Sequence, residues 1–189
     1  YSGLTSNGEM HIKGLSGKKS DTPLFIRKAF QKIMDSGKTR KTPDDLNQYK
    51  DYIKDVFMEM IKNIEEDKIQ VDDMVFTSTL SKELESYDTE SLPQNARMAT
   101  MLKDAQEKKI IDSDIEYGRD TIVSYIKVVQ GYNGWNDNVV PLQLFDKNVH
   151  KINHEKYIEK ALKVFLQIAE PFDITENELM GQTSIEDFF

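Results

Sequence analysis

Residues 42–66, TPDDLNQYKDYIKDVFMEMIKNIEE, carry the strongest indication of the fold in this sequence. Apolar residues recur there at spacings of three and four, which is the repeat of one face of an α-helix. They are Leu46, Tyr49, Ile53, Val56, Phe57, Met60 and Ile64. A hydroxyl cap at Thr42, followed at once by Pro43, supplies a start signal. We therefore predict one long helix with an apolar face turned toward a core.

Similar signals place further helices on both sides of this one. A Thr-Pro pair opens a helix over 22–37, with Thr22 as the predicted N-cap and a glycine at its end. A helix is also predicted over 93–108, with Ala96, Ala99, Leu102 and Ala105 facing inward. The last amphipathic helix is predicted over 153–170, where the following proline stops it.

Strand signals are few. Asn7-Gly8 predicts the tight turn of a hairpin within 2–12, because both central positions of such a turn need positive φ. The run TIVSYIKVV at 121–129 is rich in β-branched residues and predicts a strand. Several helices with so few strands predict an α+β, helix-dominated fold, and they exclude a doubly wound sheet.

Composition sets the class of protein. The chain has 189 residues, of which 38% are hydrophobic and 31% charged, which suits one domain or one domain with an appendage. No apolar run approaches the length of about 18–20 residues that a membrane span needs, so we expect no membrane partner. The absence of cysteine excludes disulfides, cysteine-ligated metals and thiol catalysis, and it is compatible with an intracellular setting.

The charge is unevenly distributed. The whole chain carries −8, but residues 11–41 hold nine Lys or Arg against two Asp, a net charge of +7. The remaining sequence has 16 basic and 31 acidic residues, a net charge of −15. A basic segment on an acidic body suits a polyanionic partner, although a solvated basic helix face explains the same pattern.

Within the basic segment, residues 13–19 form a loop in which two glycines alternate with three lysines. Its residues of interest are Lys13, Gly14, Gly17, Lys18 and Lys19. The spacing differs from that of a nucleotide-binding P-loop, which excludes a nucleotide hydrolase of that type. Glycines allow the backbone to approach a ligand closely and lysines supply charge for phosphates, so we predict DNA contacts here.

Catalytic constellations are hard to assemble from this sequence. His150 and His154 are four residues apart, but surface positions explain them better than a metal site. Asp112 and Asp114 form a carboxylate pair in a polar loop, which leaves a hydrolase as a weakly supported alternative. We therefore predict no catalytic residue and no metal ligand in this chain.

The last residues, 182–189, read QTSIEDFF. They fit the pattern of the PIP box, the peptide by which proteins bind a sliding clamp of the PCNA type. One helical turn would bring Ile185 beside Phe188 and Phe189 as an apolar plug, with Gln182 hydrogen-bonding next to it. The alternative is that both phenylalanines fold back onto the core.

Several ordered segments together resemble the C-terminal part of B-family DNA polymerases, most closely the archaeal type. Tyr1 is similar to the tyrosine of the Lys-x-Tyr motif at the palm edge, and 12–21 is similar to the family's Gly-Leu stretch that follows a hairpin. Residues 80–99 resemble the family's Ser/Thr-Lys/Arg-x-Leu-x-x-Tyr motif and the proline-led helix after it. Residues 118–128 and 156–160 resemble its Gly-Asp-x-Ile-x-Tyr and Tyr-Ile-Glu-Lys motifs.

The resemblance implies that the chain has three parts. The parts are a palm-edge hairpin with its basic loop (1–21), a thumb domain (22–180) and a clamp-binding peptide (181–189). The thumb would grip duplex primer–template DNA through phosphate contacts of Ser81, Lys82, Gln94 and Asn95, in addition to the loop. The sequence departs from the family pattern at Arg119, inserted before Asp120, and at Asn95, which stands where other members have histidine.

The resemblance also implies partners and limits. The family's metal-binding aspartates lie outside this sequence, so it would work with a large polymerase chain carrying palm and exonuclease, either as the small subunit of a split polymerase or as a thumb fragment cut at the palm–thumb border. No cofactor is expected in this chain, and magnesium is expected in the complete polymerase. Activity would be that of a nucleotidyltransferase in DNA replication, inactive in this chain alone and located in the cytoplasm at the nucleoid. The alternative is a non-enzymatic clamp-binding adaptor with incidental DNA affinity.

Overall fold

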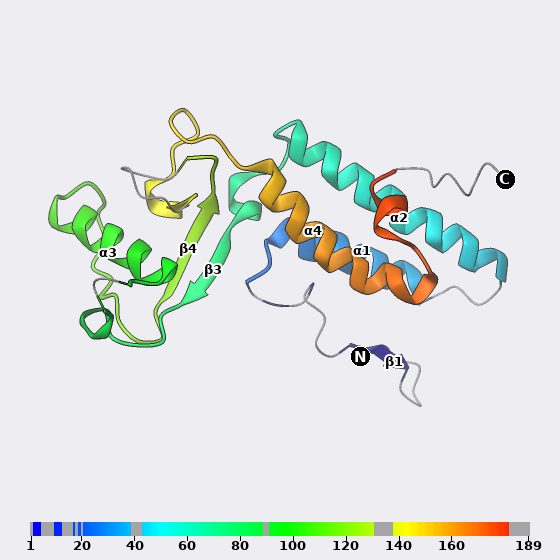
Figure 1. Cartoon of the computed structure of the whole chain (residues 1–189), viewed down its shortest axis with the longest axis horizontal. Helices are drawn as coiled ribbons and strands as arrows, with labels where there is room; N and C mark the ends of the chain where they lie inside the picture. The colour runs from blue at the N-terminus through cyan, green and yellow to red at the C-terminus, as the bar shows by residue number, and fades with distance from the viewer. Residues whose placement is uncertain are drawn as a thin grey trace. The chain divides into compact units, whose positions relative to one another are not determined.

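The computed structural model describes residues 2–4, 10–12, 17, 19, 21–38, 43–88, 91–130 and 138–181. Its contacts divide the chain into two compact units (Figure 1). The helical unit comprises 1–73 and 154–189, and the sheet unit comprises 74–153. The fold is helix-rich with a small antiparallel sheet, which confirms the predicted α+β, helix-dominated class.

Three long helices build the helical unit: α1 (Leu24–Gly37), α2 (Pro43–Glu65) and α4 (His154–Ala169). The apolar faces of these helices meet in a core where the Phe57 and Phe165 rings lie 4.9 Å apart. Short elements complete the unit, namely η2 (Val71–Met74), η6 (Glu170–Phe172) and α5 (Glu176–Leu179). The strands β1 (Ser2–Leu4) and β2 (Met10–Ile12) pair antiparallel, as the hairpin prediction requires, whereas Asn7-Gly8 lies outside the described residues.

Two details of the helical unit differ from the predictions. Six of the seven stripe residues of α2 are buried, but Leu46 is 43% exposed. Leu46 lies in the first turn, and burial along the stripe begins one turn later at Tyr49. The N-cap of α1 is Pro23 rather than Thr22, and Thr22 is fully buried. Burial at the start of α2 depends on what packs there, and the α1 N-cap differs from the prediction by one residue, as helix ends commonly do.

The sheet unit is a three-stranded antiparallel sheet in the order β3-β4-β5, packed against α3 (Gln94–Glu107). Its strands are β3 (Phe76–Thr79), β4 (Ile122–Lys127) and β5 (Val139–Pro141). Two single-turn helices flank them, η3 (Leu84–Ser86) and η5 (Leu142–Leu144). Strand β4 confirms the strand predicted in 121–129, and all four predicted inward residues of α3 are buried.

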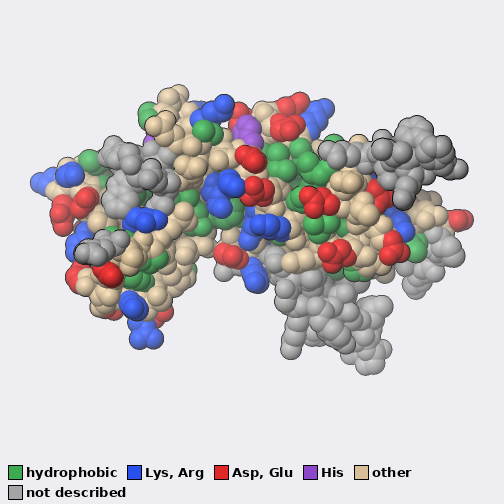
Figure 2. Space-filling view, viewed as in Figure 1, with side chains coloured by type: hydrophobic (Ala, Val, Ile, Leu, Met, Phe, Trp, Pro, Cys, Tyr) green, Lys and Arg blue, Asp and Glu red, His purple; other side chains and the backbone are tan. Residues whose placement is uncertain are grey.

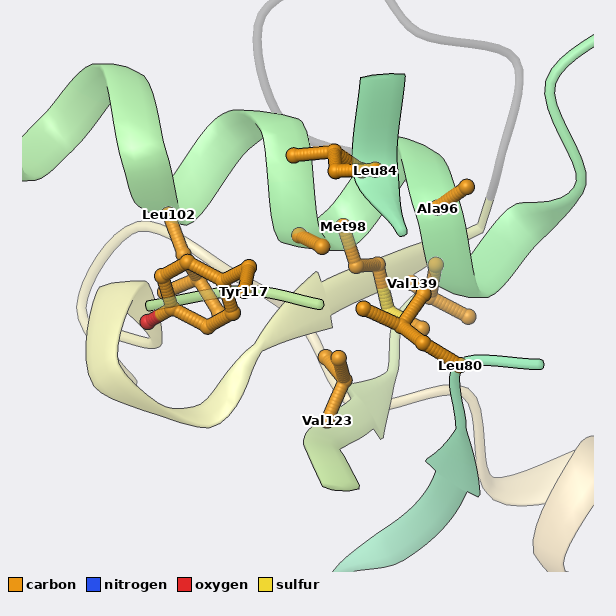
Figure 3. Close-up of a cluster of buried hydrophobic side chains, with 9 residues drawn as sticks. Leu80, Leu84, Ala96, Met98, Leu102, Tyr117, Val123 and Val139 are labelled. Atoms are coloured by element: carbon orange, nitrogen blue, oxygen red, sulfur yellow. The ribbon is translucent and has the colours of Figure 1, made fainter. Parts of the chain in front are cut away.

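The core of the sheet unit lies between α3 and the sheet (Figure 3). Met98 of α3 points toward Val139 of β5 and Leu80 after β3. On the same sheet face, the rings of Phe76 and Tyr125 stack 5.6 Å apart across a cross-strand pair. These contacts anchor both ends of the connection between β3 and α3, which carries the predicted DNA contacts.

No helix in the described ranges is both long enough and apolar enough to cross a membrane.

Candidate nucleic-acid interface

The end of β3 and the start of α3 are joined by a side-chain hydrogen bond. The Asn95 amide donates to the Thr79 carbonyl over 2.9 Å, and the Asn95 side-chain oxygen accepts the Ala96 N–H at 3.0 Å. Asn95 thus holds the first turn of α3 against the residue that precedes Leu80 and Ser81. The structure therefore brings together two predicted site segments that are 13 residues apart in the sequence.

The connection after β3 folds back on itself around one phenol. The Tyr87 hydroxyl accepts the backbone N–H of Ser81 at 2.9 Å and that of Lys82 at 3.2 Å, and it lies 3.2 Å from the Ser81 hydroxyl. The Ser81 hydroxyl, followed by these backbone groups, lowers the pKa of Tyr87 because each of them stabilises the phenolate. Tyr87 thereby fixes the backbone that presents Ser81 and Lys82.

This arrangement leaves particular groups available to a ligand. Two backbone donors fill the lone pairs of the Tyr87 oxygen, so its own proton is best placed on the Ser81 hydroxyl oxygen. The Ser81 proton then remains free to donate outward. Lys82 and Gln94 are exposed, whereas Asn95 is half-buried with its amide used within the fold. Chemically, the surface offers one cation, one hydroxyl donor and the N-terminus of α3 to an anion.

The lysine loop (residues 13–19) is described at two positions only. Gly17 is buried, and a Cβ atom there would overlap the ring of Phe30 in α1. Lys19 is exposed, and its carbonyl accepts the N–H of Thr22 at 3.1 Å. The absent side chain of Gly17 thus serves the packing of the loop on α1. The other predicted loop residues, Lys13, Gly14 and Lys18, lie outside the described residues.

Ion pairs neutralise part of the basic segment. Lys28 lies 2.8 Å from Asp73, Lys38 lies 2.6 Å from Asp35, and Lys32 lies 3.8 Å from Glu59. On the face of the molecule in Figure 2, basic and acidic side chains of the described residues alternate rather than separate into fields. These three paired lysines are therefore poor candidates for phosphate contacts, and the loop that precedes α1 is the better one.

A pocket of about 570 Å³ lies in the sheet unit beside this connection. Its charged lining residues are Glu83, Glu85, Glu107, Glu116, Lys103 and Arg119. Carboxylates outnumber cations there two to one, so the pocket suits a phosphate less well than the Ser81–Lys82 surface does. Among the described residues, no group of three or more His, Asp or Glu is placed to hold a metal ion.

The residues of the weaker catalytic alternatives have other partners. His150 is buried, so its predicted surface position is wrong, and its ring nitrogen accepts the N–H of Asp146 at 3.0 Å. His154 pairs with Asp67 at 2.8 Å. Asp112 and Asp114 are exposed. The Gln106 side-chain amide holds the segment that carries them, because it donates hydrogen bonds to two backbone carbonyls there. Nothing in these contacts supports the hydrolase.

The predicted clamp peptide, Gln182 to Phe189 with Ile185 and Phe188 between them, lies outside the described residues. The last described residue is Gly181, which has a positive φ of 68°.

Comparison with known proteins places the chain in a family. The family model for DNA polymerase family B matches residues 1–172. DNA polymerase 1 of Sulfolobus acidocaldarius is 29% identical over the whole chain, and DNA polymerase 1 of Saccharolobus solfataricus is 30% identical. The chain spans about a fifth of their length, 20% in each case.

The family B DNA polymerase of the archaeon Pyrobaculum calidifontis is similar in structure, with a TM-score of 0.59. The match covers 90% of this chain and 20% of that one, at 22% sequence identity. At this identity, the likeness supports the fold.

Tyr87 is the residue whose role sequence reasoning missed. The motif in 80–99 contains it, but a tyrosine five to six residues after its partners carries no periodic signal. Only the reverse turn through η3 brings its hydroxyl back to Ser81 and Lys82.

Proposed function

Because this chain belongs to DNA polymerase family B, we propose that it is the thumb region of a DNA-directed DNA polymerase and grips the primer–template duplex behind the active site. The observation that carries this proposal is the family match over residues 1–172, in unbroken order. The catalytic aspartates would come from the rest of the polymerase, the part that carries palm and exonuclease. We therefore expect no nucleotide incorporation by residues 1–189 alone with magnesium and primed DNA.

In this proposal, the surface after β3 binds a backbone phosphate. Lys82 supplies the charge, Ser81 donates its hydroxyl proton, and the N-terminus of α3 at Gln94 adds backbone N–H groups. Asn95 acts indirectly, because its amide holds the Thr79 carbonyl. All of these groups recognise phosphate rather than base edges, so the grip is independent of sequence, as a sliding polymerase requires.

The lysine loop would form the second phosphate contact. Gly17 anchors the loop on Phe30, which places the exposed Lys19 directly before α1. Lys13 and Lys18 would add charge on either side of this anchor, and Gly14 would let the backbone approach the duplex. The paired cations Lys28, Lys32 and Lys38 would contribute little, since each already has a carboxylate within 4 Å.

The clamp peptide would tether the polymerase to a PCNA-type clamp. Tethering raises the effective concentration of the enzyme at the primer end and therefore its processivity, without any new DNA contact. Clamp binding by this peptide is supported by the spacing of Gln182, Ile185, Phe188 and Phe189.

Salt titration of duplex binding tests the grip. Lys82→Ala should weaken binding and lower the slope of log K against log salt by about 0.9, the value for one phosphate contact. Lys108→Ala is the matched control. Lys108 is exposed at the other end of α3, about 20 Å from Gln94 along the helix. Equal slopes for both variants and the wild type would show that Lys82 does not contact DNA.

A further inference from the structure

After α4, the chain returns along α2. Asp173 adopts a left-handed φ of 57°, and the N–H of Ile174 bonds to the Ala169 carbonyl at 3.2 Å, which closes the helix end and reverses the direction. In Figure 1 the following helix, α5, lies beside α2. We call residues 172–181 the tail root, because they precede the clamp peptide directly.

The tail root contacts α2 at three successive levels. The Phe172 ring packs edge-on against Tyr49 with centroids 5.2 Å apart. The Glu178 carboxylate lies 3.6 Å from the Lys54 ammonium. At the third level, a Cβ atom on Gly181 would lie 3.6 Å from the Met58 methyl group. Tyr49 and Met58 are nine residues apart, or about 13 Å along a helix, so the root is fastened over more than two turns.

Hydrogen bonds within the segment hold α5 in its helical conformation, although it has only four residues. Thr175 and Glu178 form a reciprocal capping box: the Thr175 N–H donates to the Glu178 carboxylate at 2.7 Å, and the Glu178 N–H donates to the Thr175 hydroxyl at 3.3 Å. Leu179 is fully buried and Ile174 nearly so. A helix this short has no stability of its own, so these contacts are what order it.

From this geometry we infer that the tail root is a positioning device that fixes the departure point of the clamp peptide beside Met58 of α2. The inference rests on the proposed clamp binding. Gln182, the first residue of the clamp peptide, then follows the fastened root directly, so the peptide leaves from a fixed point. Release of the root, residues 172–181, would place a linker of ten residues before the clamp peptide and lower its effective concentration at the clamp severalfold.

Two measurements on the full chain test the device. Thr175→Ala removes the cap, and amide exchange at 178–181 should accelerate about fivefold. Lys54→Glu should also accelerate it, because two carboxylates then face each other. Glu176→Gln is the matched control, since Glu176 is exposed on the same helix and outside the capping box. Exchange that stays at the wild-type rate in both Thr175→Ala and Lys54→Glu would overturn the device.

The second measurement separates positioning from mere folding. Thr175→Ala should bind the free PCNA-type clamp as the wild type does, yet bind the clamp on primed DNA severalfold more weakly. An equal loss in both assays, or a loss in neither, would contradict positioning. If Phe188→Ala with Phe189→Ala leaves clamp binding intact, clamp tethering itself fails, while the exchange data still decide whether the root is fastened.

Discussion

The two units of this molecule are stabilised in different ways. In the helical unit, three helices of 14 to 23 residues pack large side chains such as Phe57 and Phe165. In the sheet unit, strands of three to six residues are linked by long connections, and side-chain bonds to the backbone fasten these connections. In the sheet unit, the surface after β3 therefore owes its shape to hydrogen bonds of Tyr87 and Asn95 rather than to long packed helices.

The reason is physical. A connection held only by apolar burial retains freedom along its backbone, whereas a hydrogen bond fixes one atom against another. The Tyr87 hydroxyl and the Asn95 amide fix the backbone around Ser81 at several points. The Gln106 amide does the same for the segment between α3 and β4, through the Ser113 and Ile115 carbonyls.

The largest expected effect tests whether the units are separate. Phe57→Ala removes a fully buried ring from the helical unit and should cost about 3–5 kcal/mol of the free energy of unfolding. Amide exchange should accelerate in α1, α2 and α4, whereas protection in β4 should persist. Leu102→Ala in the sheet unit is the reciprocal variant. Equal loss of protection in both units after either change would mean that they unfold as one.

A pair of glycines gives the next largest effect. Gly17→Ala places a Cβ against the rigid ring of Phe30 and should lower stability by about 1–3 kcal/mol. Gly118→Ala meets only the carboxylate of Glu83, the end of a flexible and exposed side chain, and should cost well under that. Thermal melts of the two variants measure the difference. Similar melting temperatures would show that the loop does not depend on the Phe30 contact.

Tyr87→Phe tests the hydrogen bonds of the sheet unit. It leaves the backbone N–H groups of Ser81 and Lys82 without their acceptor and should cost about 1 kcal/mol, because these exposed groups can turn to water. Duplex affinity should fall severalfold even though Lys82 is still present. Unchanged affinity in a fluorescence titration would mean that the loop keeps its shape without the phenol.

The smallest effect is a pH dependence of the tail root in the helical unit. Hydrogen bonds from the backbone N–H of Thr175, and then its hydroxyl and Lys54, hold the pKa of Glu178 below its ordinary value. A lowered pKa means that this stabilisation is present above the unfolded pKa and is lost as the pH falls through the folded one. Exchange at 178–181, corrected for intrinsic rates, should therefore rise below about pH 4 in the wild type. In Glu178→Gln the rise should be absent.

Much of the helical unit was predictable. The apolar stripe of α2 and the extent of α4 follow from the 3.6-residue repeat, which is a local property of the chain. The exposure of Leu46 was not predictable, because burial at a helix end depends on what packs there. The N-cap of α1 lies at Pro23, one residue after the predicted Thr22, because local signals locate a helix end only to within a residue or two.

The candidate site also has a predictable and an unpredictable part. The residue types of Ser81, Lys82, Gln94 and Asn95, and their order along the chain, were enough to recognise motifs that resemble those of one polymerase family. Only the tertiary structure decided that the Asn95 amide is used within the fold, that Tyr87 positions the loop and that Gly17 serves packing on Phe30. These roles depend on contacts between residues that no periodic pattern connects, and such contacts exist only once the chain has reversed direction and packed.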